Sequence, residues 1–183
     1  MAKPTIFRFM SDPDKFARFS MADVRTSYKE LSRLEPLRES WKGMAVKVYA
    51  KAKQKFGDFP GLVEMGCPVM SQRAWDVLHP LVSEFTEALP LGSFAGQEYF
   101  VIHLFEETDA LDEDKSRFTM VDGQPAKSSI LKYSFRESLL TGRHIFQIPQ
   151  LRGRDPLVSK EFKTAVEKNA LVGAKFSELD LVD

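Results

Sequence analysis

The sequence predicts an α+β protein in which a mostly antiparallel sheet, arranged as a meander, packs with a few short helices. Several short segments alternate apolar and polar side chains with the period of two that is typical of half-buried strands. In the second half, turns rich in Gly, Asp and Pro separate these segments, which favours antiparallel neighbours over βαβ units. With 183 residues, 43% of them hydrophobic and fifteen of them Phe, the chain can build a sizeable core, and we expect a single domain over 1–183.

The first third of the chain is predicted to contain two strands. The stretch TIFRF (5–9) is short and alternating, and MAVKVYA (44–50) has the same period of two. Between them, residues 12–43 are polar and lack a strict period, so we expect helix and loop there. Gly and Pro in GDFPG (57–61) indicate a turn.

Two later segments have helical spacing, and each follows a serine that can accept a hydrogen bond from the first turn. Ser71 is the expected N-cap of a helix over 71–89, whose apolar residues recur every three or four positions. Pro80 should break or bend this helix, giving either two short helices or one bent helix, because proline has no amide proton. Ser159 is the expected N-cap of the second helix, over 158–171.

The remaining pattern is one of strands and turns. LPLGSFAGQ (89–97) is expected to be a loop, and AKFSEL (174–179) a short extended tail. The expected strands are EYFVIHLF (98–105), SRFTMV (116–121), SSILKYSF (128–135) and HIFQIP (144–149).

An acidic segment follows the strongest strand candidate, in VIHLFEETDALDEDKS (101–116). It fails as a calcium-binding loop, because Arg117 occupies the place where such a loop needs glycine. Asp109 and Asp112 have the side chains to cap a short turn. The carboxylates that we expect to face a partner are Glu106, Glu107, Asp112, Glu113 and Asp114.

No pattern in the sequence indicates a catalytic or metal site. His79, His103 and His144 lack metal-ligand spacing, and no cysteine pair accompanies them. Cys67 lies in the apolar, uncharged stretch EMGCPVM, which should raise the pKa of a thiol and favours a buried structural role. Hydrolase and nucleotide-binding motifs are missing from the sequence. We therefore expect no catalytic residue, no metal ligand and no cofactor.

The sequence also predicts a cytoplasmic protein without a membrane partner. No run approaches the roughly 18 to 20 apolar residues of a membrane-spanning helix, and the start MAKPTIFRFM lacks the features of a signal peptide. Cys67 is the only cysteine, so an internal disulfide is impossible and a reducing compartment is expected.

The charges are segregated along the chain, although they sum to zero. Residues 1–55 hold 13 Lys and Arg against 6 Asp and Glu, whereas residues 56–125 hold 3 against 13. Such a middle segment can steer a basic partner, or folding can interleave the segments and cancel the field. The basic run KVYAKAKQKF (47–56), with Lys47, Lys51, Lys53 and Lys55, mixes cations with aromatic rings as nucleic-acid-binding segments do. The alternation of apolar and polar residues explains the same lysines as the solvent-exposed face of a strand, so a nucleic-acid partner is not expected.

Several short motifs follow one another in a recognisable order: GCPVMSQRAWDVLHPL, ALPLGSFAGQEYFVIHLFEETDALDEDKS, SILKYSF, HIFQIP, LVSKEF and ALVGAKF. In this order they resemble immunity protein family eleven of bacterial polymorphic toxin systems. The resemblance covers a core over 58–178, and residues 1–57 are less characteristic. The family has no defined catalytic residues to transfer to this sequence.

The resemblance implies a non-enzymatic immunity protein that binds a cognate toxin in the cytoplasm and neutralises it by occluding its active site. If the acidic residues face that partner, the toxin should present a basic surface, as a nuclease or another phosphate-binding enzyme does. The opposing hypotheses are a small cytoplasmic enzyme, a nucleic-acid-associated factor with an unrecognised site, and a structural protein of a larger assembly.

Overall fold

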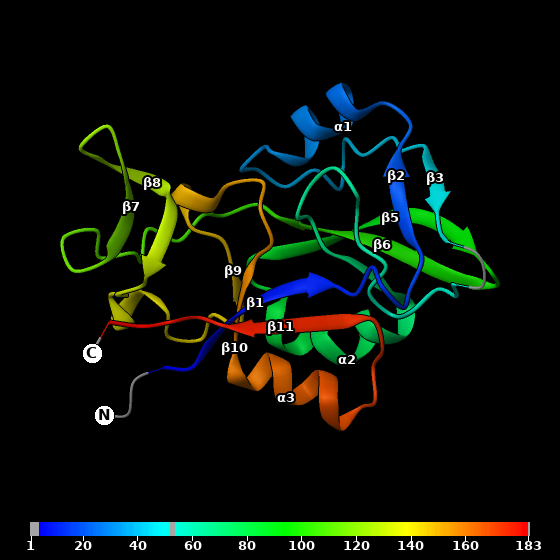
Figure 1. Ribbon diagram of the computed structural model, residues 1–183. Helices are drawn as coiled ribbons and strands as arrows, with labels where there is room; N and C mark the ends of the chain where they lie inside the picture. Colours follow the sequence, from blue (N-terminus) through cyan, green and yellow to red (C-terminus); the bar gives the residue numbers. More distant parts are fainter. Residues whose placement is uncertain (1–3, 52–53, 183) are drawn as a thin grey trace.

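The computed structural model describes residues 4–51 and 54–182, and this part of the chain has an α+β fold (Figure 1). Its helices are α1 (Val24–Leu31), α2 (Gln72–Val82) and α3 (Lys160–Lys168), with single 3-10 turns at η1 (Glu137–Leu139) and η2 (Pro149–Leu151). Its strands are β1 (Ile6–Ser11), β2 (Arg18–Met21), β3 (Val46–Tyr49), β4 (Val69–Ser71), β5 (Thr86–Phe94), β6 (Gln97–Leu104), β7 (Arg117–Val121), β8 (Gln124–Lys132), β9 (Ile145–Phe146), β10 (Leu157–Ser159) and β11 (Ala174–Glu178). The predicted α+β class is confirmed.

The strands divide among several small sheets and do not form one continuous meander. The sheet orders are β11-β1-β10-β9, β2-β3, β4-β6-β5 and β7-β8, and each of these pairings is antiparallel. Consecutive strands pair in the hairpins β5–β6 and β7–β8, as a meander requires. The sheet around β1 differs, because the N-terminal strand lies between two strands from the end of the chain.

Three clusters of buried apolar side chains hold these sheets together. The first lies between the β1 sheet, the β5–β6 hairpin and the helices α2 and α3, which pack beneath the strands in Figure 1. Phe9 is at its centre, with ring centroids 5.3 Å from Phe59 and 5.2 Å from Phe162 in edge-to-face contact. The second cluster joins β2 to β4, β5 and β6, and the third lies beside β9 and η2 and anchors the β7–β8 hairpin.

Both predicted helix caps are confirmed. The side chain of Ser71 accepts a hydrogen bond from the backbone N–H of Ala74, and that of Ser159 accepts one from Phe162. The second helix is shorter than predicted, because Leu157–Ser159 pairs with β1 as β10 before α3 begins.

The predicted helix over 71–89 is correct only in its first part. The structure has a single α2 that continues through Pro80 and ends at Val82. The prediction of helix to residue 89, followed by a loop over 89–97, is wrong: Thr86–Phe94 is β5, which pairs with β6. The pairing buries Thr86 to Leu89 against the sheet, and this tertiary burial outweighs their helical spacing.

The polar stretch 12–43 also contains more regular structure than its sequence suggests. It includes β2, whose Phe19 is fully buried, and the short helix α1. β2 pairs with β3, the strand that the sequence did predict.

Candidate partner-binding surface

The acidic segment links the last residue of β6, Leu104, to the first residue of β7, Arg117. It runs along the molecule from the central sheet towards the β7–β8 hairpin (Figure 1). Its apolar residues fasten it to the body, since Ala110 and Leu111 are buried and the backbone N–H of Thr108 donates to Gln147. The acidic side chains therefore lie on a segment that is held in place along its length.

The first acidic residues of the segment are paired with arginines from later in the chain. Glu106 binds Arg143, and Glu107 accepts hydrogen bonds from two nitrogens of Arg152. The side chain of Glu107 is only 8% exposed. The guanidinium of Arg143 also lies over the ring of Phe85, 3.8 Å from its centroid. Glu106 and Glu107 thus join the segment to the 143–152 region.

The next acidic residue, Asp109, is exposed, and its carboxylate lies 3.1 Å from Arg136. Asp112 caps the turn that leads into β7, as predicted: its side chain accepts a hydrogen bond from the backbone N–H of Lys115. Its backbone oxygen accepts from the N–H and the hydroxyl of Ser116. Hydrogen bonds from Lys115 hold the pKa of the Asp112 carboxyl below its ordinary value. The turn hypothesis therefore holds for Asp112.

Glu113 and Asp114 differ in their surroundings. Glu113 accepts hydrogen bonds from Lys127 and Gln150, each at 2.7 Å, and these bonds lower the pKa of its carboxyl. Asp114 is exposed, and its side chain has no hydrogen bond or ion pair to any residue that the structure describes. Of the five predicted partner-facing carboxylates, Asp114 alone lacks an internal counterpart within the described residues.

The sequence left two electrostatic outcomes open for this segment, a negative field that steers a basic partner or cancellation by interleaved cations. These ion pairs show that cancellation applies here. The cations that meet its carboxylates come from residues 115–152, so folding interleaves charges of opposite sign here. The sequence showed the excess of acids but not their partners, because Glu107 and Arg152, for example, are 45 positions apart. The surface is a network of ion pairs.

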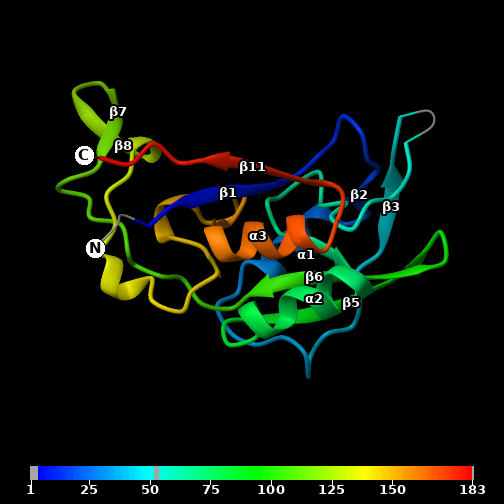
Figure 2. The same cartoon turned by 90° about the horizontal axis from the view of Figure 1, so that it is seen from below.

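The β7–β8 hairpin beside this segment carries exposed apolar side chains, which the sequence pattern did not indicate. Met120, Val121 and Leu131 are 60%, 55% and 59% exposed. Phe118 and Ile130 on the same hairpin pack against the third core cluster and hold it to the body. The hairpin projects at one end of the molecule in both views (Figure 2). Apolar side chains next to ion pairs are the composition of many protein-binding surfaces.

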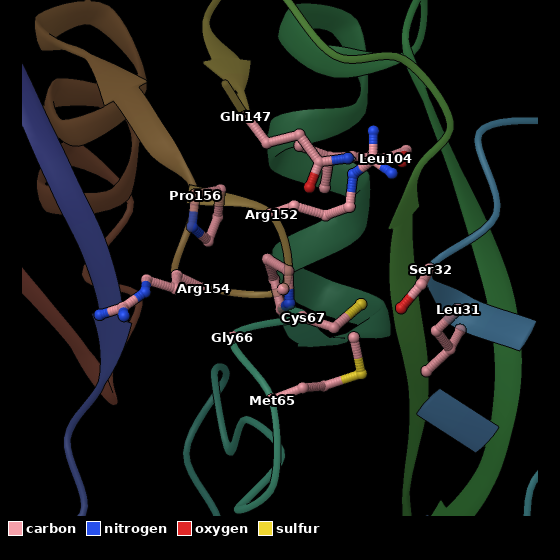
Figure 3. Close-up of a pocket in the computed structure, with 12 residues that line it drawn as sticks. Leu31, Ser32, Met65, Gly66, Cys67, Leu104, Gln147, Arg152, Arg154 and Pro156 are labelled. Atoms are coloured by element: carbon pink, nitrogen blue, oxygen red, sulfur yellow. Dashed lines mark hydrogen bonds between the residues drawn. The ribbon is translucent and has the colours of Figure 1, made fainter. Parts of the chain in front are cut away.

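A small pocket is lined in part by Arg152, the partner of Glu107 (Figure 3). Arg152, Gln147, Cys67 and Met65 are among the side chains around it. Its cavity volume is about 20 Å³, enough for one water molecule. This pocket is too small to bind a substrate.

The thiol of Cys67 has the structural setting that the sequence suggested. Its sulfur lies 3.2 Å from the carbonyl oxygen of Ile102, to which it donates a hydrogen bond, and burial raises the pKa of the thiol to about 12. A thiol in this setting is a poor nucleophile, because the reactive form is the thiolate.

The three histidines come from different elements and have different hydrogen-bond and ring partners. His103 is buried, with Nδ1 2.8 Å from Glu87 and Nε2 2.8 Å from the carbonyl oxygen of Arg33. His79 is exposed and packs edge-on against Trp75, whereas His144 contacts Ser159 beside the start of α3. In residues 4–51 and 54–182, no group of three or more His, Cys, Asp or Glu side chains is placed to hold a metal ion.

The lysines of the basic run considered for nucleic-acid binding do not all lie on one element of the structure. Lys47 lies on β3, Lys51 and Lys55 follow it, and Lys53 lies outside the described residues.

In the part of the chain that is described, no helix has the length and apolar character needed to cross a bilayer.

Together, the fold and this surface define a small α+β protein with an ion-paired, partly apolar face. The particular family follows from comparison with known families. The Immunity protein family (Imm11) model matches residues 21–180, and the chain belongs to this family. The match begins well before residue 58, so it includes much of the part that had been less characteristic. No curated protein matches the chain.

Proposed function

We propose that this protein binds a cognate toxin in the cytoplasm of the producing cell and neutralises it by covering the toxin's active site. The observation that carries this proposal is the family match, which extends over residues 21–180. The ion-paired surface is compatible with action by binding, since it offers both charged and apolar contacts at one end of the molecule. In this proposal the chain itself makes and breaks no covalent bond.

The turn from Asp112 to Asp114 is our candidate for the charged rim of the toxin interface. The cations that meet Asp112 and Glu113 are highly exposed, Lys115 at 73% and Lys127 at 63%. Exposed ion pairs contribute only about 0 to 1 kcal/mol, so a basic toxin side chain can replace these lysines at small cost. Asp114 can meet a basic toxin side chain directly, because no lysine or arginine in the described part of this chain has to be displaced first.

Glu106 and Glu107 belong to the proposed interface in a different way. The carboxylate of Glu107 is buried against Arg152, and separating such a pair leaves a buried charge without its partner. We therefore assign these two residues to holding the segment in place under the toxin, and the Asp112–Asp114 turn to contacting it. A complementary toxin face is basic, as expected of a nuclease or another phosphate-binding enzyme.

Charge reversal tests this interface. The triple variant Asp112→Lys, Glu113→Lys and Asp114→Lys should weaken binding of the cognate toxin domain, and should weaken the salt dependence of that binding. The Kd at two salt concentrations is the measurement, with circular dichroism to verify folding. A matched control reverses three exposed acids elsewhere, Asp76, Glu84 and Glu98, with the same change in net charge.

Equal Kd values for the triple variant and the control would remove the Asp112–Asp114 turn from the interface while leaving the immunity function standing. The function itself is tested separately, by co-expression. Cells that produce the toxin domain should grow when this chain is present, and continued toxicity at equal expression would contradict the proposal.

A further inference from the structure

The outer edge of β3 has backbone groups that face away from the rest of the protein. β3 pairs with β2 on one side, and no strand in the described residues pairs with its other side. Phe19 of β2 is bonded to Gly61 and Val63, so its N–H and C=O point away from β3. Pairs in an antiparallel ladder alternate, and Val48, the partner of Phe19, must likewise direct its N–H and C=O outward. The same alternation applies to Val46.

The side chains of β3 divide between two faces in a way that an added strand would complete. Val48 lies on the same face as the fully buried Phe19, yet it is 50% exposed because nothing covers it from the edge. Lys47 and Tyr49 point to the opposite face, where the guanidinium of Arg18 lies 5.7 Å from the centroid of the Tyr49 ring. The edge therefore presents an apolar position on one face and cations on the other.

The cations around this edge are unbalanced, in contrast to the acidic segment at the other end of the molecule. In residues 4–51 and 54–182, no carboxylate forms an ion pair with Lys15, Lys47, Lys51 or Lys55. Gln54 bonds to the backbone oxygens of residues 13 and 14, which brings the segments that carry these lysines together.

The carboxylates in this region are fewer than the cations. Asp12 and Asp14 share Lys175, which chiefly lowers the pKa of the Asp14 carboxyl, and Lys51 and Lys15 lower it further. Glu64 accepts hydrogen bonds from Ser20 and from the N–H of Met21, and these neutral donors leave its charge in place. These three carboxylates face six cations (Lys15, Arg18, Lys47, Lys51, Lys55 and Lys175), so an excess of positive charge remains at this end.

We propose that the outer edge of β3 binds an acidic, extended segment of a partner protein as an added strand. Its backbone would pair with Val46 and Val48, an apolar side chain would cover Val48, and carboxylates on its other face would meet Lys47 and Arg18. In strand addition, backbone hydrogen bonds give affinity and alternate side chains give specificity. β3 lies at the end of the molecule opposite the β7–β8 hairpin in both views, so this surface is separate from the proposed toxin interface (Figures 1 and 2).

Strand addition has two alternatives at this edge: binding of a nucleic acid, or an edge whose lysines only protect it from aggregation. Each alternative predicts results that differ from those of strand addition. A nucleic acid would use the lysines and Tyr49, but it has no backbone amides to pair with the edge. Lysines also protect exposed edge strands from aggregation, in which case no ligand would bind. The backbone of Val48 separates these cases, because only strand addition requires its N–H.

The test uses the full chain and a synthetic peptide of alternating Glu and Val as the probe. Hydrogen exchange followed by NMR should show slower exchange at the Val46 and Val48 amides when the peptide is present, and a peptide of alternating Lys and Val should have no such effect. Lys47→Glu should weaken binding at least about tenfold, since an attraction becomes a repulsion. Lys160→Glu, at an exposed lysine on α3, is the matched control and should leave binding unchanged.

A second variant examines the edge itself. Val48→Pro removes an N–H that makes no bond to β2, so it should abolish peptide binding while the β2–β3 pairing persists. Absence of peptide binding, equal binding of both peptides, or a single-stranded oligonucleotide that binds equally well to the Val48→Pro variant would overturn the proposal. Toxin neutralisation should be the same in these variants as in the wild type, which keeps this test distinct from that of the proposed function.

Discussion

Glu87→Ala removes the acceptor that holds the 33–38 segment against the β5–β6 hairpin. The Glu87 carboxylate accepts hydrogen bonds from the backbone N–H groups of Leu37 and Arg38, and it contacts His103 at 2.8 Å. Leu37, Glu87 and His103 are almost completely buried, so the groups that lose this acceptor are poorly placed to find another one. A hydrogen bond to a charged group contributes about 1.5 to 3 kcal/mol, and Glu87 accepts two such bonds from backbone N–H groups. We therefore expect the free energy of unfolding to fall by about 4 kcal/mol.

Urea denaturation followed by circular dichroism measures this loss. With a slope of about 2 kcal/mol per molar urea, the midpoint should move down by about 2 M. Glu84→Ala is the matched control, because Glu84 is exposed and only three positions away; its midpoint should stay within about 0.3 M of the wild type. A similar shift in both variants, or a shift below about 0.5 M for Glu87→Ala, would show that Glu87 does not hold this segment in place.

Three further predictions concern other parts of the molecule. Gly66→Ala should prevent stable folding, visible as a large drop in melting temperature, because the added Cβ would lie 2.1 Å from the carbonyl carbon of Arg154; an unchanged melting temperature would contradict this packing. The Cys67 thiol, with its pKa raised to about 12, should react slowly with a disulfide reagent at pH 8 in the folded protein and rapidly in urea. The lowered pKa of Glu113 means that its ion pair stabilises the fold above the ordinary value of 4.5 and is lost as pH falls through the lower folded value. An NMR titration should place the Glu113 midpoint below 4.5, and Lys127→Met should raise it; equal midpoints would contradict the pairing.

The features that the sequence predicted correctly are local ones. Ser71 and Ser159 were identifiable as caps because a cap needs only a serine and the amides of the next turn. The strand over 98–105 was identifiable because it combines β-branched and aromatic residues between turns, and β6 occupies Gln97–Leu104.

The features that it missed depend on residues far away in the chain. Thr86 to Leu89 has a pattern compatible with a helix, and only pairing with Val101 to Leu104 makes it a strand. The short strands β2, β4 and β10 likewise exist because a neighbour pairs with them. Short apolar runs do not specify their state by periodicity alone.

The candidate site divides in the same way. The acidic residues and the capping turn at Asp112 could be found from the sequence. The arginines and lysines that neutralise the segment could not, because nothing local relates Glu106 to Arg143. The unbalanced cations around β3 could not be recognised either, since the sequence does not show which lysines lack a carboxylate after folding.

The stoichiometry of neutralisation tests whether this chain acts by covering the toxin. The activity of the purified toxin domain is measured while this chain is added in steps. Neutralisation by covering the active site predicts that inhibition rises in proportion to the added chain and is complete at one chain per toxin. Complete loss of activity at a small fraction of an equivalent would mean that the chain modifies the toxin catalytically, and no inhibition at several equivalents would mean that it does not neutralise the toxin at all.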